Sequence, residues 1–153
     1  MGLTLKSGYG LRALVELAKA QESGHPKLSV KEILERQEMP KDFLEKILGE
    51  LRQAGIVETV RGRHGGYRLA MPASKVTVKS VIDALETPMR VLSCIINQDC
   101  PRFGDCAVKY VWYKVNDAIT RELADMTLKD LVEIESRLKT SRDLKGLMEM
   151  KEV

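Results

Sequence analysis

The sequence predicts a mainly α-helical fold that carries one small β hairpin. Apolar residues recur at helical spacing through most of the chain, and this pattern is interrupted once, by a short glycine-containing stretch at residues 56–69. Two of the helical segments are joined by only a few residues around 37–39. Two helices joined in this way and followed at once by a hairpin are typical of a winged helix-turn-helix domain with a two-stranded β wing.

Three helices are expected in the first 55 residues. The second begins at a capping box formed by Ser29 and Glu32, in which each side chain binds a backbone amide of the first turn. Pro40 suits the first turn of the third helix, and Gly55 ends it. The residues expected on the buried faces are Leu11, Leu14, Val15 and Ala18; Val30, Ile33 and Leu34; and Leu44, Ile47, Leu48 and Leu51.

The rest of the chain is expected to form the wing and three further helices. Residues 56–60 and 67–69 are predicted strands, and the glycines between them permit the positive φ of a tight reversal. A fourth helix ends near residues 87–88, and Thr127 caps a short final helix. Between them, a helix over 107–126 carries a stripe too apolar for a solitary helix, formed by Val108, Val111, Trp112, Val115, Ile119, Leu123 and Met126.

The net charge is +3, and its positive excess lies in the first half of the chain. Residues 1–75 carry 13 Lys and Arg against 9 Asp and Glu, whereas residues 76–153 carry 12 against 13. A polyanion is expected to bind the first half, the plain alternative being a chance imbalance on a solvated surface. No stretch approaches the roughly 20 apolar residues needed to cross a bilayer, and no signal peptide is recognisable. We therefore expect a cytoplasmic protein without a membrane partner.

Two sets of polar residues are candidates for DNA contact. The second helix of a helix-turn-helix enters the major groove, and its outward residues here are Lys41, Asp42, Glu45, Lys46 and Arg52. Carboxylates can accept a hydrogen bond from a cytosine amino group, while lysines mostly neutralise phosphates. The wing carries Arg61, Arg63, His64 and Arg68 around a narrow glycine-rich tip that fits a minor groove. An exposed, non-binding helix face or turn is the alternative for each residue taken singly.

The chain has three cysteines, Cys94, Cys100 and Cys106, with five residues between neighbours. An odd number of thiols cannot close a framework of intramolecular disulfides. Zinc usually takes four protein ligands, often in Cys-x-x-Cys pairs, and neither feature is present. Three clustered thiolates fit an iron–sulfur cluster better, with Cys106 favoured further by a helix start. A buried structural thiol remains the alternative for Cys94.

The chain resembles the iron–sulfur-responsive winged-helix regulators of the IscR and NsrR type across essentially its whole length. The matching segments are Tyr9-Gly10-Leu11-Arg12-Ala13, Phe43-Leu44-Glu45-Lys46-Ile47-Leu48, the wing from Val60 to Leu69, and the three cysteines. The resemblance implies a homodimer built on the long helix and a pseudo-palindromic operator of double-stranded DNA. It also implies that Cys94, Cys100 and Cys106 bind the iron of a cluster, with a 2Fe-2S form favoured over a 4Fe-4S form.

The chain departs from the family pattern at Gly8, at Lys109 and in the wing. IscR-type members place a histidine three residues after the last cysteine, where this chain has Lys109, and NsrR-type members place an aspartate where it has Gly8. The fourth ligand therefore stays open, and the possible donors are His25, Asp99, Asp105, Glu122 and a small thiol. The wing has Arg63-His64 where Pro-Gly is usual.

The expected organisation is a winged helix-turn-helix domain over 1–88, a cysteine loop over 89–106, dimerisation helices over 107–138 and a flexible tail over 139–153. The expected function is a dimeric transcription regulator whose operator affinity is controlled by a labile cluster. One alternative is a cluster-free regulator controlled by cysteine oxidation or a partner protein. An enzyme is disfavoured, because His25 and His64, the only imidazole bases, lie in turns of the DNA-binding half. A purely structural dimer module is disfavoured by the arginine-tipped wing.

Overall fold

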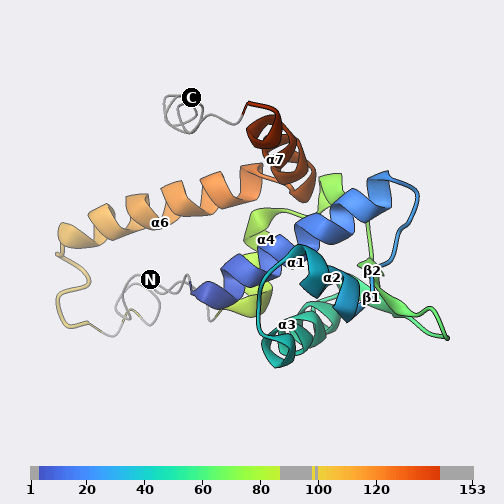
Figure 1. Ribbon diagram of the computed structural model, residues 1–153. Helices are drawn as coiled ribbons and strands as arrows, with labels where there is room; N and C mark the ends of the chain where they lie inside the picture. The colour runs from blue at the N-terminus through green and yellow to red at the C-terminus, as the bar shows by residue number, and fades with distance from the viewer. Residues whose placement is uncertain (1–3, 87–97, 99, 142–153) are drawn as a thin grey trace.

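The computed structural model describes residues 4–86, 98 and 100–141. It confirms a mostly helical fold with one two-stranded antiparallel sheet, arranged as a winged helix (Figure 1). In chain order the elements are α1 (Leu5–Glu22), α2 (Val30–Arg36), α3 (Lys41–Gln53), β1 (Val57–Val60), β2 (Gly66–Leu69), the 3₁₀ turn η1 (Ala73–Lys75), α4 (Val78–Leu85), α6 (Val108–Asp125) and α7 (Leu128–Ser141).

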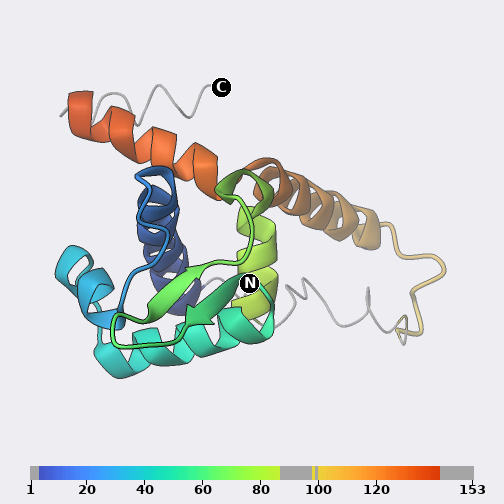
Figure 2. The same cartoon turned by 90° about the vertical axis from the view of Figure 1, so that its right-hand side faces the viewer.

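The core is built around α1, which contacts α2, α3, α4, α7 and the second strand (Figure 2). The apolar side chains of the first four helices meet there because each helix has one apolar face. The fully buried side chains include Leu14, Leu17, Ile33, Leu44, Ile47, Leu48, Leu51, Val81 and Leu128. The apolar face expected for α3 is thus entirely buried, which leaves its opposite face exposed.

Local signals begin and end the helices of the helix-turn-helix. Ser29 and Glu32 form both hydrogen bonds of the expected capping box at the start of α2. Pro40 is the cap residue of α3 and not part of its first turn, as its ψ of 132° is extended. Gly55 has a φ of +73°, the left-handed conformation that ends α3 at low steric cost.

The wing is fixed to the loop that precedes α2. Strand β1 pairs with β2 in the register Val57↔Leu69 to Val60↔Gly66. On the other side of β2, Tyr67 exchanges two backbone hydrogen bonds with Leu28, of 2.8 and 2.9 Å. A Cβ atom on Gly66 would lie 2.4 Å from the carbonyl oxygen of Leu28, so only glycine allows this close approach.

Helix α6 projects away from the winged-helix body and carries the cysteine segment at its far end (Figures 1 and 2). Its other end is anchored, because Val78 donates a backbone hydrogen bond to Met126 and Leu128 donates one to Val76. The stripe expected on α6 is largely uncovered, as no residue of the helix is buried.

Helix α7 returns to the body and packs on α1, where Leu128 and Val132 join the core. It therefore completes the winged-helix body, a role that the expected grouping of residues 107–138 as dimerisation helices did not include. Helix α7 also continues to Ser141, so the first three residues of the expected tail are helical. The rest of that tail and most of the loop expected over 89–106 lie outside the described residues. Among the helices described, none is long and apolar enough to cross a membrane.

Candidate DNA-binding surface and cysteine segment

The five polar residues predicted to face outward on α3 are all exposed. They are Lys41, Asp42, Glu45, Lys46 and Arg52. Lys41 and Glu45 form an ion pair of 3.9 Å one turn apart, at an exposed position where such pairs contribute little stability. Lys46 and Arg52 form no ion pair with the described residues. The outer face of α3 thus presents both hydrogen-bond acceptors and unpaired cations, as contact with base edges and phosphates requires.

The tip of the wing is a second exposed cationic surface. Arg61, Arg63 and His64 are exposed, and neither arginine is within ion-pair distance of a carboxylate in the described part of the chain. Gly62 has a φ of +122°, which the reversal of the chain at the tip requires. Arg68 differs from the tip arginines, because its Nε donates a 2.6 Å hydrogen bond to Glu58 directly across the sheet.

Two of the three cysteines lie in the described part of the chain. Cys100 and Cys106 are free thiols, and both are half-buried. The residues between them form a turn in which Phe103 donates a backbone hydrogen bond of 2.9 Å to Cys100 and Asp105 donates one of 3.1 Å to Arg102. Cys106 comes just before Ala107, the cap residue of α6. Cys94 lies outside the described residues.

Lys109 holds this turn against the first turn of α6. Its ammonium donates hydrogen bonds of 2.6 Å to the carbonyl of Phe103 and 3.3 Å to that of Gly104. It also lies 4.6 Å from the centre of the Phe103 ring, within the range of a cation–π contact. The sequence marked position 109 only as the site of a missing histidine, so this structural role was not foreseen.

The structure separates two possible fourth ligands from Cys100 and Cys106 of the same protomer. His25 lines a groove together with Arg63 and His64 of the wing. The wing lies on the opposite side of the molecule from the described residues just before α6 (Figure 1). Glu122 is 16 residues beyond Cys106, mostly along α6, which corresponds to about 24 Å. Asp105 is exposed next to Cys106, and Asp99 lies outside the described residues. No group of three or more His, Cys, Asp or Glu side chains positioned for a metal ion occurs among the residues that the structure describes.

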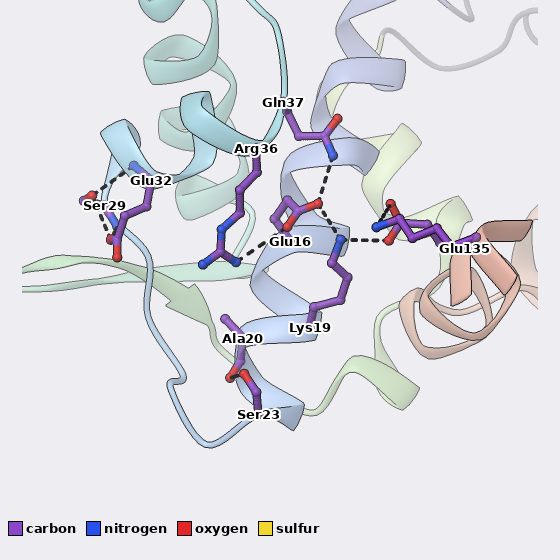
Figure 3. A network of polar contacts seen from close by, with 10 residues as sticks. Glu16, Lys19, Ala20, Ser23, Ser29, Glu32, Arg36, Gln37 and Glu135 are labelled. Carbon is purple, nitrogen blue, oxygen red and sulfur yellow. Dashed lines mark hydrogen bonds and ion pairs between the residues drawn. The ribbon is translucent and has the colours of Figure 1, made fainter. Parts of the chain in front are cut away.

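A polar network around one buried carboxylate joins three elements near the turn of the helix-turn-helix (Figure 3). Its centre is Glu16 of α1, only 3% exposed, which accepts hydrogen bonds of 2.6 Å from Lys19 and 2.9 Å from Gln37 and pairs with Arg36 at 3.6 Å. Lys19 also donates a 2.8 Å hydrogen bond to Glu135 of α7. Burial opposes the charge of Lys19, but its bonds to Glu135 and Glu16 outweigh burial and raise its pKa.

The sequence did not predict this network, because its members follow no motif that distinguishes them from exposed polar residues. The available signal was Glu16 itself, a carboxylate at a position between Ala13 and Leu17 that belongs to the buried side of the helix. A buried carboxylate needs a cation or several donors, and here it has both.

The family model for Rrf2, described as an iron-dependent transcriptional regulator, matches residues 3–134. Protein rrf2 of Nitratidesulfovibrio vulgaris is 36% identical over 133 residues, covering 86% of this chain and 87% of that protein. The HTH-type transcriptional regulator IscR of Vibrio atlanticus is 35% identical over 133 residues, covering 86% of this chain and 75% of that protein. The family model and the IscR relative are both described as transcriptional regulators.

Solved structures show the same fold. IscR of T. potens superposes with a TM-score of 0.70 at 31% identity, covering 88% of both chains. CymR, the global cysteine regulator of B. subtilis, gives a TM-score of 0.71 at 31% identity, covering 88% of this chain and 98% of CymR. The oxidized form of CymR from Staphylococcus aureus gives 0.67 at 34% identity, covering 87% of this chain and 97% of that protein. From the matched family model, the relatives and the shared fold, we conclude that this chain belongs to the Rrf2 family of transcriptional regulators.

Proposed function

We propose that this regulator binds a pseudo-palindromic operator in double-stranded DNA as a homodimer, and that its cysteine segment controls operator affinity through an iron–sulfur cluster. The observation that carries the DNA-binding part is the pair of exposed, unpaired arginines at the wing tip, Arg61 and Arg63, beside the polar outer face of α3. Cations without carboxylate partners are available to replace counterions on the phosphate backbone. Other exposed cations of the described chain, such as Arg68 and Arg121, are instead paired with carboxylates.

The geometry suggests a division of roles within the interface. The N-terminal residues of α3, Lys41, Asp42, Glu45 and Lys46, enter the major groove, where the two carboxylates accept from bases and the lysines contact phosphates. Arg61 and Arg63 enter the adjacent minor groove, with His64 beside them. Arg52 and Arg68 lie farther along the chain from the N-terminus of α3 and from the wing tip, respectively. Arg68 must break its ion pair with Glu58 to reach a phosphate.

The homodimer is proposed to form along α6. Val108, Val111 and Val115 are exposed at 56%, 55% and 37%, and their spacing places them on one face of the helix. Such a face is stable in water only when a second apolar surface covers it. A second copy of the same helix supplies that surface with two-fold symmetry, which matches the symmetry of a palindromic operator.

Cys94, Cys100 and Cys106 are proposed to hold the cluster. The donor chemistry fits, because thiolates are the usual ligands of iron–sulfur clusters and the two described thiols are unpaired and accessible. When bound, the cluster would supply chemistry that is sensitive to oxygen, nitric oxide or iron supply. The relatives support this proposal, since several are IscR proteins and the family is described as iron-dependent.

A cluster-free regulator controlled by cysteine oxidation or by a partner protein is the second candidate. It is favoured by two half-buried free thiols without a described fourth ligand, and by the similarity to CymR in its oxidized form. Oxidants attack a cysteine as its thiolate, and Cys106 lies just before the first turn of α6.

Visible absorption separates the two candidates. Protein purified without oxygen should absorb between roughly 320 and 450 nm, and air or nitric oxide should bleach that absorption, if thiolates bind iron. Colourless, iron-free protein would instead favour control through thiols or a partner. Fluorescence anisotropy with labelled duplexes tests DNA binding separately, and R61A should lower affinity roughly 5–150-fold. Unchanged affinity in R61A together with R63A would contradict the proposed role of the wing.

A further inference from the structure

A groove of about 500 Å³ separates the wing tip from the loop that connects α1 to α2. Its polar lining comes from both sides and consists of His25, Lys27, Ser29, Glu32, Arg63 and His64. His25 and Lys27 belong to none of the surfaces assigned above. We propose that this groove binds a phosphate of the DNA backbone, with Lys27 and His25 clamping the strand opposite Arg63. The proposal rests on the DNA-binding function proposed above and adds a contact to it.

The two walls of the groove are held at a fixed separation. The backbone hydrogen bonds between Leu28 and Tyr67 attach the loop to β2. They lie next to Lys27 in the loop and next to Gly66 in β2. His25 is anchored at the other end of the loop by its own backbone N–H, which donates a 3.0 Å hydrogen bond to the carbonyl of Ala20. A preorganised groove loses less conformational freedom on binding than a free loop would.

The charge of the groove suits a phosphate. Lys27 and Arg63 are exposed, and neither forms an ion pair in the part of the chain that the structure describes. The single carboxylate, Glu32, is occupied, because it accepts hydrogen bonds of 2.7 and 2.8 Å from the backbone N–H and the hydroxyl of Ser29. Those bonds lower the pKa of Glu32. The groove therefore holds the positive charges of Lys27 and Arg63 and one carboxylate that is already hydrogen-bonded.

The position of the groove favours DNA over a free anion. A second groove, between α2 and α3, is lined by Ser29 together with Lys41 and Glu45 of the outer face of α3. Since Ser29 lines both grooves, they adjoin at the start of α2. One continuous surface therefore runs from the recognition helix to the wing tip, and a duplex lying on it passes the groove with its sugar–phosphate backbone.

Anisotropy titrations over a salt series test the assignment. The probes are a duplex selected by the unsubstituted protein from a random pool and an unselected duplex of the same length. We expect Lys27→Ala to weaken binding to both duplexes by the same factor and to reduce the salt slope by about 0.9 per bound protomer. Over a change from 50 to 200 mM salt, that slope corresponds to about 3.5-fold in affinity. Lys27→Arg should retain the slope of the unsubstituted protein.

Lys75→Ala is the matched control, because Lys75 is also an exposed lysine and lies in η1, outside the grooves described above. If Lys27→Ala behaves like Lys75→Ala while Arg61→Ala loses affinity, the groove assignment is wrong and the proposed function stands. If the loss in Lys27→Ala is confined to the selected duplex, the residue reads bases and the phosphate assignment is wrong. If the unsubstituted protein binds neither duplex, the proposed function fails and the groove assignment fails with it.

Discussion

The side-chain amide of Gln37 donates a 2.9 Å hydrogen bond to the buried carboxylate of Glu16. This contact joins the turn of the helix-turn-helix to the central helix α1. The same carboxylate accepts from Lys19, which in turn binds Glu135 on α7. The position of the recognition helix is thus connected by hydrogen bonds to the helix that follows α6.

Removing the Glu16 carboxylate should destabilise the protein. Glu16→Ala leaves the Gln37 amide without its acceptor and leaves Lys19 with Glu135 alone, in a partly buried site, at a cost of about 1–3 kcal/mol. The free energy of unfolding in urea measures this loss. Glu22→Ala, at the exposed end of the same helix, is the control and should stay within about 0.5 kcal/mol of the parent. Equal stability of the two variants would contradict a structural role for the network.

The start of α7 should make stability depend on pH in the acid range. The hydroxyl and backbone N–H of Thr127 donate hydrogen bonds of 2.7 and 2.8 Å to Asp130, and these bonds lower the pKa of Asp130 below its ordinary value of 3.8. A lowered pKa in the folded state adds stability that is present above about pH 3.8 and is lost as the pH falls through the folded-state pKa.

Asp130→Asn should therefore be less stable than the parent at pH 6, and the difference should shrink below pH 4. Urea unfolding at a series of pH values between 3 and 7 measures it. Asp83→Asn, a carboxylate whose ion pair with Lys79 is exposed, provides the comparison. A stability difference that is constant across this range would show that the charge of Asp130 is not the source of the effect.

Gly66→Ala should disrupt the wing, because the added methyl would meet the Leu28 carbonyl at 2.4 Å. Relieving this clash requires breaking the paired hydrogen bonds between Leu28 and Tyr67, so we expect a loss of about 1–3 kcal/mol. Gly49→Ala within α3 is the control, since nothing lies within 4 Å of its new methyl, and it should gain about 0.5–1 kcal/mol. Thermal unfolding distinguishes the expected loss of stability in Gly66→Ala from the expected gain in Gly49→Ala.

Lys109→Gln should open the turn between Cys100 and Cys106. The variant loses the ammonium that binds the carbonyls of Phe103 and Gly104, so the exposed Arg102 becomes more accessible to trypsin. We expect cleavage after Arg102 to become several-fold faster, as followed by mass spectrometry. Lys114→Gln, on the same helix but outside this contact, should leave the rate unchanged. A similar rate in both variants would contradict the tethering role.

A charge on the apolar face of α6 should weaken the proposed homodimer. Val111→Glu places a carboxylate among Val108 and Val115, where burial against a second copy is costly. Sedimentation velocity should show a shift toward monomer at micromolar concentration. Arg121→Gln changes the net charge by the same amount on an exposed ion pair and should remain dimeric. A dimer that persists in Val111→Glu would place the interface elsewhere.

Local signals in the sequence predicted most of the fold. The capping box at Ser29, the left-handed stop at Gly55 and the apolar face of α3 each depend on residues within one or two turns of one another, and the structure confirms all three. The exposure of the polar face of α3 followed from the same periodicity. Contacts between distant segments could not be obtained in this way.

The pairing of Leu28 with Tyr67 depends on bringing residues 39 positions apart into register, for which the sequence carries no periodic signal. The return of α7 onto α1 is of the same kind, because the apolar face of α7 fits a dimer interface as well as it fits the core. The ion pair that engages Arg68 likewise became apparent only once Glu58 lay opposite it in the sheet.

Among the described residues, backbone hydrogen bonds anchor α6 to the body at the end near Met126, and this makes the helix a lever. Its 18 residues span about 27 Å, with a fulcrum at residues 126–128, where backbone hydrogen bonds attach it to the body. A rotation of about 6° at that fulcrum displaces the end of α6 next to Cys106 by about 3 Å. Conversely, a shift of that size imposed at the thiols reaches the winged helix as a small change of angle. Between two protomers, such an angle sets how far apart the recognition helices lie.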